Sequence, residues 1–129
     1  MALIDQQADV IFQIASAAGD GVFEAAREKG IYAIGVDSDQ KYIDEEVIIC
    51  SMKKEVGESI YQAIKQMIAE GDKCTLWGTT WIANMSTGFV GIGYGEDGSQ
   101  QQISDELKAE VAELAKKIIA GEITVDTTR

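Results

Sequence analysis

The stretch that decides the fold is ADVIFQIASAAGDGVFEAAREKGIYAIGVDSDQ, residues 8–40. It begins with an apolar run at 10–14, whose β-branched and aromatic residues predict a strand buried on both faces. A glycine-bearing turn follows at 15–21, and apolar residues at helical spacing predict a helix over 22–29 that ends at a glycine. A second apolar run at 31–36 completes a β-α-β unit.

Two turns leave the carboxyl ends of these predicted strands, at residues 15–19 and 37–40. Because crossovers between parallel strands are right-handed, both turns are expected on one rim of the sheet. That rim is where open α/β sheets bind ligands, so it is the first place to expect a site.

The rest of the chain continues to alternate strands with helices. A strand is predicted at 47–51, an amphipathic helix from Lys54 to the glycine at 71, strands at 74–77 and 88–94, a helix capped by Ser104, and a short edge strand at 123–125. The alternation predicts an α/β fold, a three-layer α/β/α arrangement with a largely parallel sheet, in a single domain over residues 1–129.

Composition excludes several classes of function. The net charge of -11 repels nucleic-acid phosphates, so no nucleic-acid partner is expected. No apolar run approaches the ~18 residues that a spanning helix needs, and no membrane insertion is expected. The start, MALIDQQADV, resembles no secretory signal, which predicts that the chain as given is cytoplasmic or is a piece cut from a longer precursor.

Catalytic chemistry has little support in the sequence. Histidine is absent, no nucleophile lies beside a base, and no residues have metal-ligand spacing, so we expect no enzyme, no metal and no cofactor. Cys50 and Cys74 each lie in an apolar run, where a buried free thiol is the favoured interpretation and a disulfide between them is the alternative.

Four phrases, ADVIFQ, GVFEAAREKG, YAIGVDSDQ and SMKKEVGESIYQAIKQ, carry a resemblance to a known family. They resemble the basic membrane protein family of type 1 periplasmic binding proteins, which includes bacterial purine nucleoside receptor lipoproteins. The likeness covers most of the chain but only the last part of such a protein. It implies half of that two-lobed fold, a purine nucleoside as ligand and a role in ABC-type uptake. If the chain is a fragment of a full-length member, the resemblance also implies an extracytoplasmic, membrane-anchored location.

The resemblance also implies ligand-binding residues. Asp37 matches the acid that binds sugar hydroxyls, and a carboxylate suits two vicinal hydroxyl donors; the alternative is that it only caps a turn. Lys54 matches the lysine of a Ser-x-x-Lys turn that reaches the purine. The alternative is a solvated lysine that opens a helix. Lys53 lies next to it, so the match to the family's lysine is open by one residue. Ala17 is carried over as a contact from a turn that is richer in glycine in the family.

Two other patterns compete for a role in binding. Residues 93–98 match G-x-G-x-x-G, but no helix starts inside the motif and its acids oppose a pyrophosphate, which favours a glycine-rich loop. The aromatic residues Trp77, Trp81, Phe89 and Tyr94 have faces that stack on a base, although core packing is the commoner use.

Two hypotheses of different classes therefore remain. The first is a solute-binding module for a purine nucleoside. The second is a ligand-free interaction module whose exposed apolar surface and sheet edges pair with a second copy, which predicts a homodimer or a higher homo-oligomer.

Overall fold

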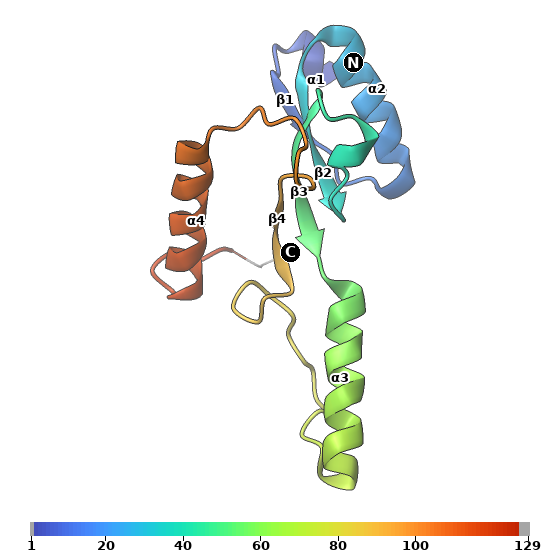
Figure 1. The fold of residues 1–129 in the computed structure, drawn as a ribbon, viewed down its shortest axis with the longest axis vertical. Coiled ribbons are helices and arrows are strands. Elements are labelled where there is room, and N and C mark those ends of the chain that lie inside the picture. The colour runs from blue at the N-terminus through green and yellow to red at the C-terminus, as the bar shows by residue number, and fades with distance from the viewer. Residues whose placement is uncertain (1, 127–129) are drawn as a thin grey trace.

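A computed structural model describes residues 2–126 and contains one four-stranded sheet, in the order β1-β2-β3-β4 (Figure 1). The strands are β1 (Val10–Phe12), β2 (Tyr32–Asp37), β3 (Ile48–Lys54) and β4 (Val90–Gly93). The α-helices are α1 (Ala2–Asp5), α2 (Asp20–Lys29), α3 (Val56–Glu70) and α4 (Asp105–Ile119). Short 3₁₀ helices span Ser16–Gly19, Lys41–Ile43 and Gly71–Lys73.

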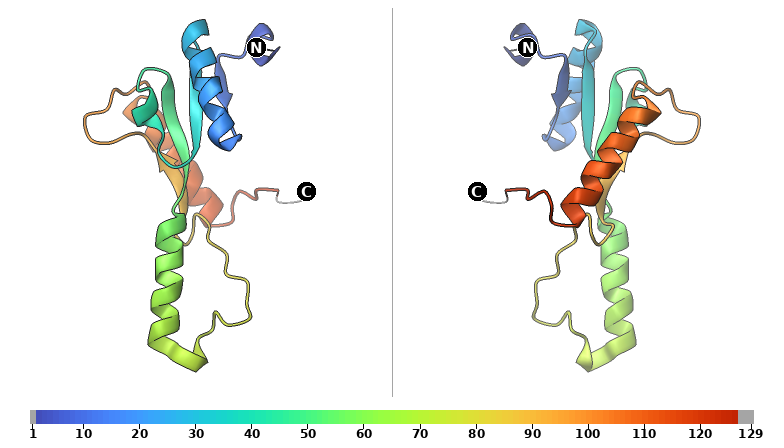
Figure 2. Two further views of the ribbon diagram at one scale, coloured as in Figure 1. Left: turned by 90° about the vertical axis from the view of Figure 1, so that its right-hand side faces the viewer. Right: turned by 90° about the vertical axis from the view of Figure 1, so that its left-hand side faces the viewer.

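The sheet is mostly parallel, as predicted. Strands β1, β2 and β3 run parallel, and β4 pairs with β3 in the opposite direction. Helix α2 lies on one side of the sheet and α4 on the other, which two further views make clear (Figure 2). The predicted α/β class with helices flanking a largely parallel sheet is therefore confirmed.

The hydrophobic core is small and lies under α2. Phe23 and Ala26 of α2 pack against Ala33, Val47 and Ile48, and all five are buried. The apolar residues that predicted α2 are thus the ones on its buried face, which packs on the centre of the sheet.

Several predicted elements differ from the structure. Strand β1 is shorter than predicted and is not buried, because it lies at the sheet edge; Val10 and Phe12 are both exposed. Residues 74–77 and 123–125 form turns and irregular chain in place of the predicted strands. The apolar runs there have no neighbouring strand to pair with, and apolar content alone does not make a strand. Residues 127–129 of the predicted tail lie outside the described part.

Helix α3 projects away from the sheet (Figures 1 and 2). Its amphipathic pattern is clear in the sequence, yet none of its residues is buried. Among residues 2–126, no helix combines the length and apolar character needed to cross a bilayer.

Helix α4 lies beside β3 and β4 and leaves an apolar cavity of about 520 Å³ between them. Met52 and Ile92 line the sheet side of this cavity, and Val111, Leu114 and Ile118 line the helix side. None of the residues of α4 is fully buried, so the helix is held loosely.

Candidate functional site

The two turns that follow β1 and β2 lie at one rim of the sheet, as the sequence predicts. They enclose a pocket of about 290 Å³. Its lining comes from both turns and from the connection to β3: Ser16, Ala17, Asp20, Val36, Asp37, Ser38, Gln40, Tyr42 and Ile43.

Ala17 lies in the 3₁₀ helix Ser16–Gly19 and lines the rim pocket. Its side chain is exposed, and a methyl group offers a ligand only a small apolar contact. The predicted turn is thus present at the expected edge, and the backbone is regular enough to form hydrogen bonds of its own, from the Ala18 N–H to the Ala15 carbonyl.

Asp37 ends β2 in an unusual backbone conformation. Its φ is 71°, and the N–H of Ser38 donates to the carbonyl of Val36 across it at 2.9 Å. A positive φ with a hydrogen bond between residues i and i+2 is the pattern of a γ-turn, which is rare and strained for a residue other than glycine. Asp37 is therefore a turn residue, as the alternative interpretation held, but one whose turn costs free energy.

Lys54 meets Asp37 directly. Its Nζ lies 2.8 Å from Asp37 Oδ1, and both side chains are about half exposed. Lys54 is the last residue of β3, and α3 begins at Val56, so the prediction that Lys54 opens the helix is wrong. The neighbouring Lys53 pairs with Glu55 at 2.7 Å, so the two lysines have different partners, and the choice of Lys54 over Lys53 stays a prediction.

The ion pair between Asp37 and Lys54 leaves both groups accessible to a ligand. Pairs between exposed side chains contribute little to stability, about 0–1 kcal/mol. A ligand hydroxyl can therefore donate a hydrogen bond to Asp37 Oδ2 without breaking a strong interaction. Lys54 does not itself line the 290 Å³ pocket, and it approaches the rim from the β3 side.

An aromatic residue at this rim was not predicted. Tyr42 lines the pocket and is 75% exposed. The aromatic residues considered from the sequence lie elsewhere: Trp81 and Phe89 pack edge to face at 5.2 Å, and Tyr94 lies under Lys108. No signal in the sequence favoured Tyr42, because it lies in a polar connection without periodicity.

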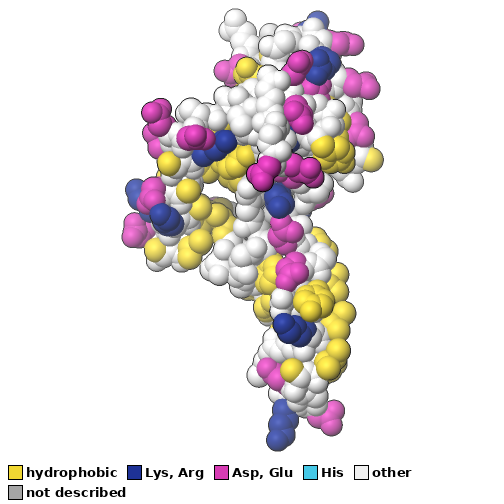
Figure 3. Space-filling model, in the orientation of Figure 1, with side chains coloured by type: hydrophobic (Ala, Val, Ile, Leu, Met, Phe, Trp, Pro, Cys, Tyr) yellow, Lys and Arg dark blue, Asp and Glu magenta, His cyan; other side chains and the backbone are white. Residues whose placement is uncertain are grey.

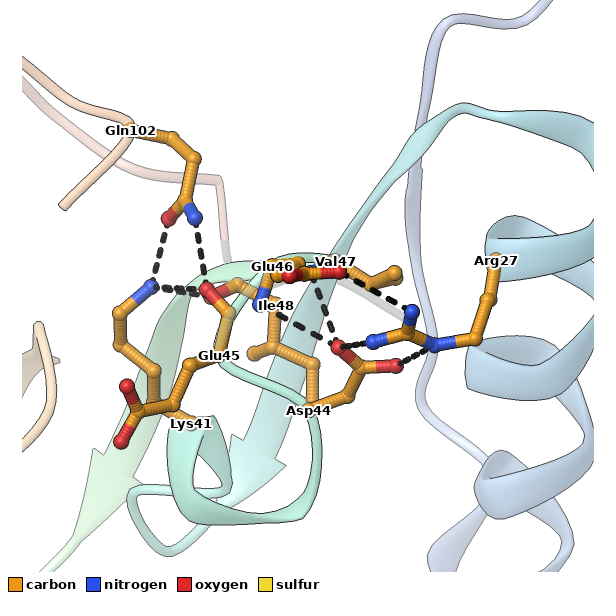
Figure 4. Close-up of polar contacts among 8 residues, drawn as sticks. All are labelled: Arg27, Lys41, Asp44, Glu45, Glu46, Val47, Ile48 and Gln102. Carbon is orange, nitrogen blue, oxygen red and sulfur yellow. Dashed lines mark hydrogen bonds and ion pairs between the residues drawn. The ribbon is translucent and has the colours of Figure 1, made fainter. Parts of the chain in front are cut away.

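The connection between β2 and β3 is anchored on both sides (Figure 4). On one side, Arg27 of α2 binds Asp44 through two nitrogens and reaches Glu46 at 3.1 Å. Burial of Asp44 opposes its ionisation, but hydrogen bonds from Arg27 and from the Val47 and Glu46 N–H groups outweigh this effect and lower its pKa.

On the other side, the ammonium of Lys41 is fully buried. It donates to the carbonyls of Ile48 at 2.6 Å and Glu45 at 3.2 Å, and to Gln102 Oε1 at 2.6 Å (Figure 4). Burial lowers the pKa of Lys41, and the charges of Glu45 and Asp39 oppose that shift. Three acceptors match the three donors of an ammonium, so this lysine anchors the loop after β4.

The glycine-rich loop at 93–98 is structural, as the sequence favoured. The N–H of Gly95 donates to Asp39 Oδ2 at 2.8 Å. A Cβ at Gly93 would lie 2.3 Å from the same oxygen, so the close approach requires glycine. Helix α4 begins only at Asp105, well beyond the motif, and a dinucleotide fingerprint is not formed.

Cys50 and Cys74 are free thiols, and no disulfide joins them. Burial raises the pKa of Cys50, with the charge of Lys41 opposing and that of Asp39 adding to the shift. Within residues 2–126, no group of three or more potential metal-ligating side chains comes together.

The whole chain, residues 1–129, matches the family model described as "ABC transporter substrate-binding protein PnrA-like". Among curated relatives, basic membrane protein C of Borreliella burgdorferi strain N40 is 33% identical over 123 residues, which cover 94% of this chain and 33% of the relative. The chain thus spans about a third of the length of the curated relatives that it matches.

Solved structures share the fold. A protein from Bacillus halodurans described as a transcriptional activator of the comK gene aligns with a TM-score of 0.79 at 22% identity, covering 97% of this chain and 41% of that one. An ABC transporter solute-binding protein from Aeropyrum pernix K1 aligns with a TM-score of 0.75 at 24% identity, covering 99% and 43%.

Proposed function

We propose, from the premise that this chain belongs to the PnrA-like family of ABC transporter substrate-binding proteins, that its rim pocket binds a purine nucleoside for uptake. Such a role belongs outside the cytoplasmic membrane, where a binding protein delivers its solute to a transporter. The assigned contacts are Asp37 for sugar hydroxyls, Lys54 for an acceptor on the purine, and Ala17 against the ligand's apolar surface.

The observation that supports this proposal most is the strained turn at Asp37. Residues held at sparsely populated backbone angles cost on the order of 1–3 kcal/mol and cluster where ligands bind. Here the strain presents a half-exposed carboxylate at the rim between two loops, with a lysine 2.8 Å away. A carboxylate beside a donor suits a ligand that combines hydroxyl groups with a ring acceptor.

Tyr42 supplies the remaining feature that a nucleoside needs. Its ring is exposed and borders the same pocket, and bases stack on aromatic faces. The pocket is open to solvent, and a small-molecule site normally buries most of its ligand, so binding by this chain is expected to be weak.

Calorimetric titration of the chain with guanosine, inosine and adenosine tests the proposal. We expect heat with at least one nucleoside, and Asp37→Asn should weaken binding by about 10- to 100-fold, the usual loss for a hydrogen bond to a charged group. The 2′-deoxy form of the same nucleoside should bind more weakly to the wild type and lose little further affinity in Asp37→Asn, because the two changes remove the same contact.

Asp72→Asn is the matched control, since it neutralises an exposed carboxylate beyond the far end of α3. It should leave the titration unchanged. No heat from any nucleoside at millimolar concentration, or equal losses in the two variants, would contradict the receptor function.

A second candidate function is self-assembly through α3. The helix carries five large apolar side chains that are half exposed or more: Val56, Ile60, Tyr61, Ile64 and Ile68. In the space-filling view, hydrophobic side chains gather along one edge of this helix (Figure 3). Contiguous apolar surface of this kind marks interfaces. A second copy of the chain would bury it, and the absence of nucleoside binding would favour this candidate over the first.

A further inference from the structure

Two glutamine side chains connect the loops of the rim pocket. Gln13 follows β1 and is 3% exposed, and Gln40 follows the turn after β2. The Nε2 of Gln13 donates to Oε1 of Gln40 at 3.0 Å. One hydrogen bond between carboxamides thus joins the turn that contains Ala17 to the turn that contains Asp37.

The orientation of both carboxamides is fixed by the backbone. The N–H of Val36 donates to Gln40 Oε1 at 2.8 Å, and the N–H of Ala15 donates to Gln13 Oε1 at 3.0 Å. If either amide were reversed, an NH₂ group would face a backbone N–H. Gln13 must therefore be the donor and Gln40 the acceptor.

The surrounding chain leaves room for this pair and for little else. A Cβ at Gly19 would lie 2.2 Å from Gln13 Oε1, and a Cβ at Gly35 would lie 2.9 Å from Gln40 Oε1. The backbone N–H of Gln40 also donates to the Oγ of Ser51, a fully buried residue of β3, at 3.0 Å. The pair thus links three segments that are distant in sequence.

The pair acts directly on the base of the strained turn. Val36 donates its N–H to Gln40 and accepts, through its carbonyl, the hydrogen bond from Ser38 that closes the turn around Asp37. A strained conformation persists only where surrounding contacts over-determine it. The contact from Gln40 fixes the residue on which the turn depends.

We propose that Gln13 and Gln40 are positioning residues, which lock the two rim loops into one unit and hold Asp37 in its strained turn. The consequence for ligand affinity rests on the proposed function; the consequence for the backbone does not. Gln40 lines the rim pocket, whereas Gln13 does not line it and acts through Gln40.

Two variants with the same chemical change test this inference. Gln13→Glu replaces the donor that Gln40 requires with an oxygen, so two acceptors face each other. Gln40→Glu keeps an acceptor for both Val36 and Gln13, and within residues 2–126 the structure gives Gln40 Nε2 no hydrogen bond to lose. Both variants add one negative charge, but Gln13 is 3% exposed and Gln40 is only partly buried, so Gln13→Met, which removes the donor without adding a charge, is measured beside them.

The first readout is the backbone, and it needs no ligand. In Gln13→Glu we expect hydrogen exchange at the Val36 and Ser38 amides to accelerate by about tenfold or more. The three-bond coupling of the Asp37 amide, which reports φ, should move toward the value of an ordinary extended residue. In Gln40→Glu exchange should stay within about threefold of the wild type.

The second readout is nucleoside affinity, which should fall by about tenfold or more in Gln13→Glu. Gln40 lines the rim pocket, so Gln40→Glu is the control for the exchange measurement only. If Gln13→Glu does not fold, Gln13→Met removes the donor without adding charge and replaces it in both measurements. Equal exchange rates in Gln13→Glu and Gln40→Glu, or an unchanged Asp37 turn in the Gln13 variants, overturn the inference. A wild type that binds no nucleoside overturns the proposed function instead, and the exchange data still decide the coupling.

Discussion

Three residues of one connection show how environment assigns different tasks to similar side chains. Asp37 has a strained backbone and an exposed carboxylate, whereas Asp44 is largely buried and saturated with donors. The ammonium of Lys41 donates hydrogen bonds to backbone carbonyls inside the protein. Asp44 and Lys41 stabilise the connection, whereas the carboxylate of Asp37 pairs with Lys54 and stays half exposed at the rim.

Asp44 makes stability depend on pH in a defined direction. Its folded pKa lies below the ordinary value of 3.8, so its contribution is fully present above that value and is lost as the pH falls through the lower folded pKa. At neutral pH, Asp44→Asn should reduce the free energy of unfolding by about 1 kcal/mol, because an NH₂ group then faces Arg27. The difference from the wild type should shrink as the pH falls below 3.8 and through the lower folded pKa of Asp44. Urea unfolding across the acid range measures it.

Asp97→Asn provides the control for that series, since Asp97 is an exposed carboxylate in the loop after β4. Its curve should follow the wild type at every pH. A difference between Asp44→Asn and the wild type that persists unchanged in acid would show that the carboxylate charge is not the cause.

At the scale of elements, the helices separate into those fixed by packing and those fixed by their own sequence. Helix α2 buries Phe23 and Ala26 against the sheet, but α3 and α4 have no buried residues. The last two depend on local signals such as caps and charges near their ends. In α4 the Oγ of Ser104 accepts from the Leu107 N–H at 3.2 Å, and acids occupy the first turn.

Removing that cap should loosen α4 selectively. Ser104→Ala is expected to cost about 1 kcal/mol of local stability, because one N–H of the first turn loses its acceptor. Hydrogen exchange of the α4 amides measures this loss, and the amides of β2 should not change. Ser104→Asp keeps an acceptor at the cap and should exchange like the wild type; equal acceleration in both variants would argue against the capping role.

In the molecule as a whole, many large apolar side chains lie exposed outside the small core. The large apolar side chains of α3 are exposed and an apolar cavity lies between α4 and the sheet, whereas the core contains a few residues under α2. The chain also spans about a third of its curated relatives. In the self-assembly proposed above, a second copy of the chain covers this surface.

If α3 mediates assembly, Ile64→Lys should shift the chain from dimer to monomer, because it places a charge in the middle of the buried stripe. Light scattering on a sizing column over a range of concentrations measures the mass. Ala69→Lys adds the same charge on the opposite face of α3 and should leave the dimer intact. A wild type that stays monomeric at high concentration would exclude assembly through this helix.

The sequence by itself determined the β-α-β unit, the two turns at one rim, the amphipathic helices and the cap at Ser104. These features follow from local periodicity and capping residues, and from the rule that parallel crossovers are right-handed. Family likeness added Asp37 and Lys54, whose side chains the fold brings within 2.8 Å, although their role in binding stays a prediction.

Tertiary structure alone decided how exposed each element is and how the rim is held. The sequence of β1 predicts a buried strand, but the strand lies at an edge of the sheet. The sequence of α3 predicts a packed helix, but none of its residues is buried. Burial depends on neighbouring elements, which periodicity does not specify. The contact between Gln13 and Gln40 joins residues 27 positions apart, and the strain at Asp37 arises from the same long-range contacts. No local pattern encodes a hydrogen bond between loops that only the folded sheet brings together.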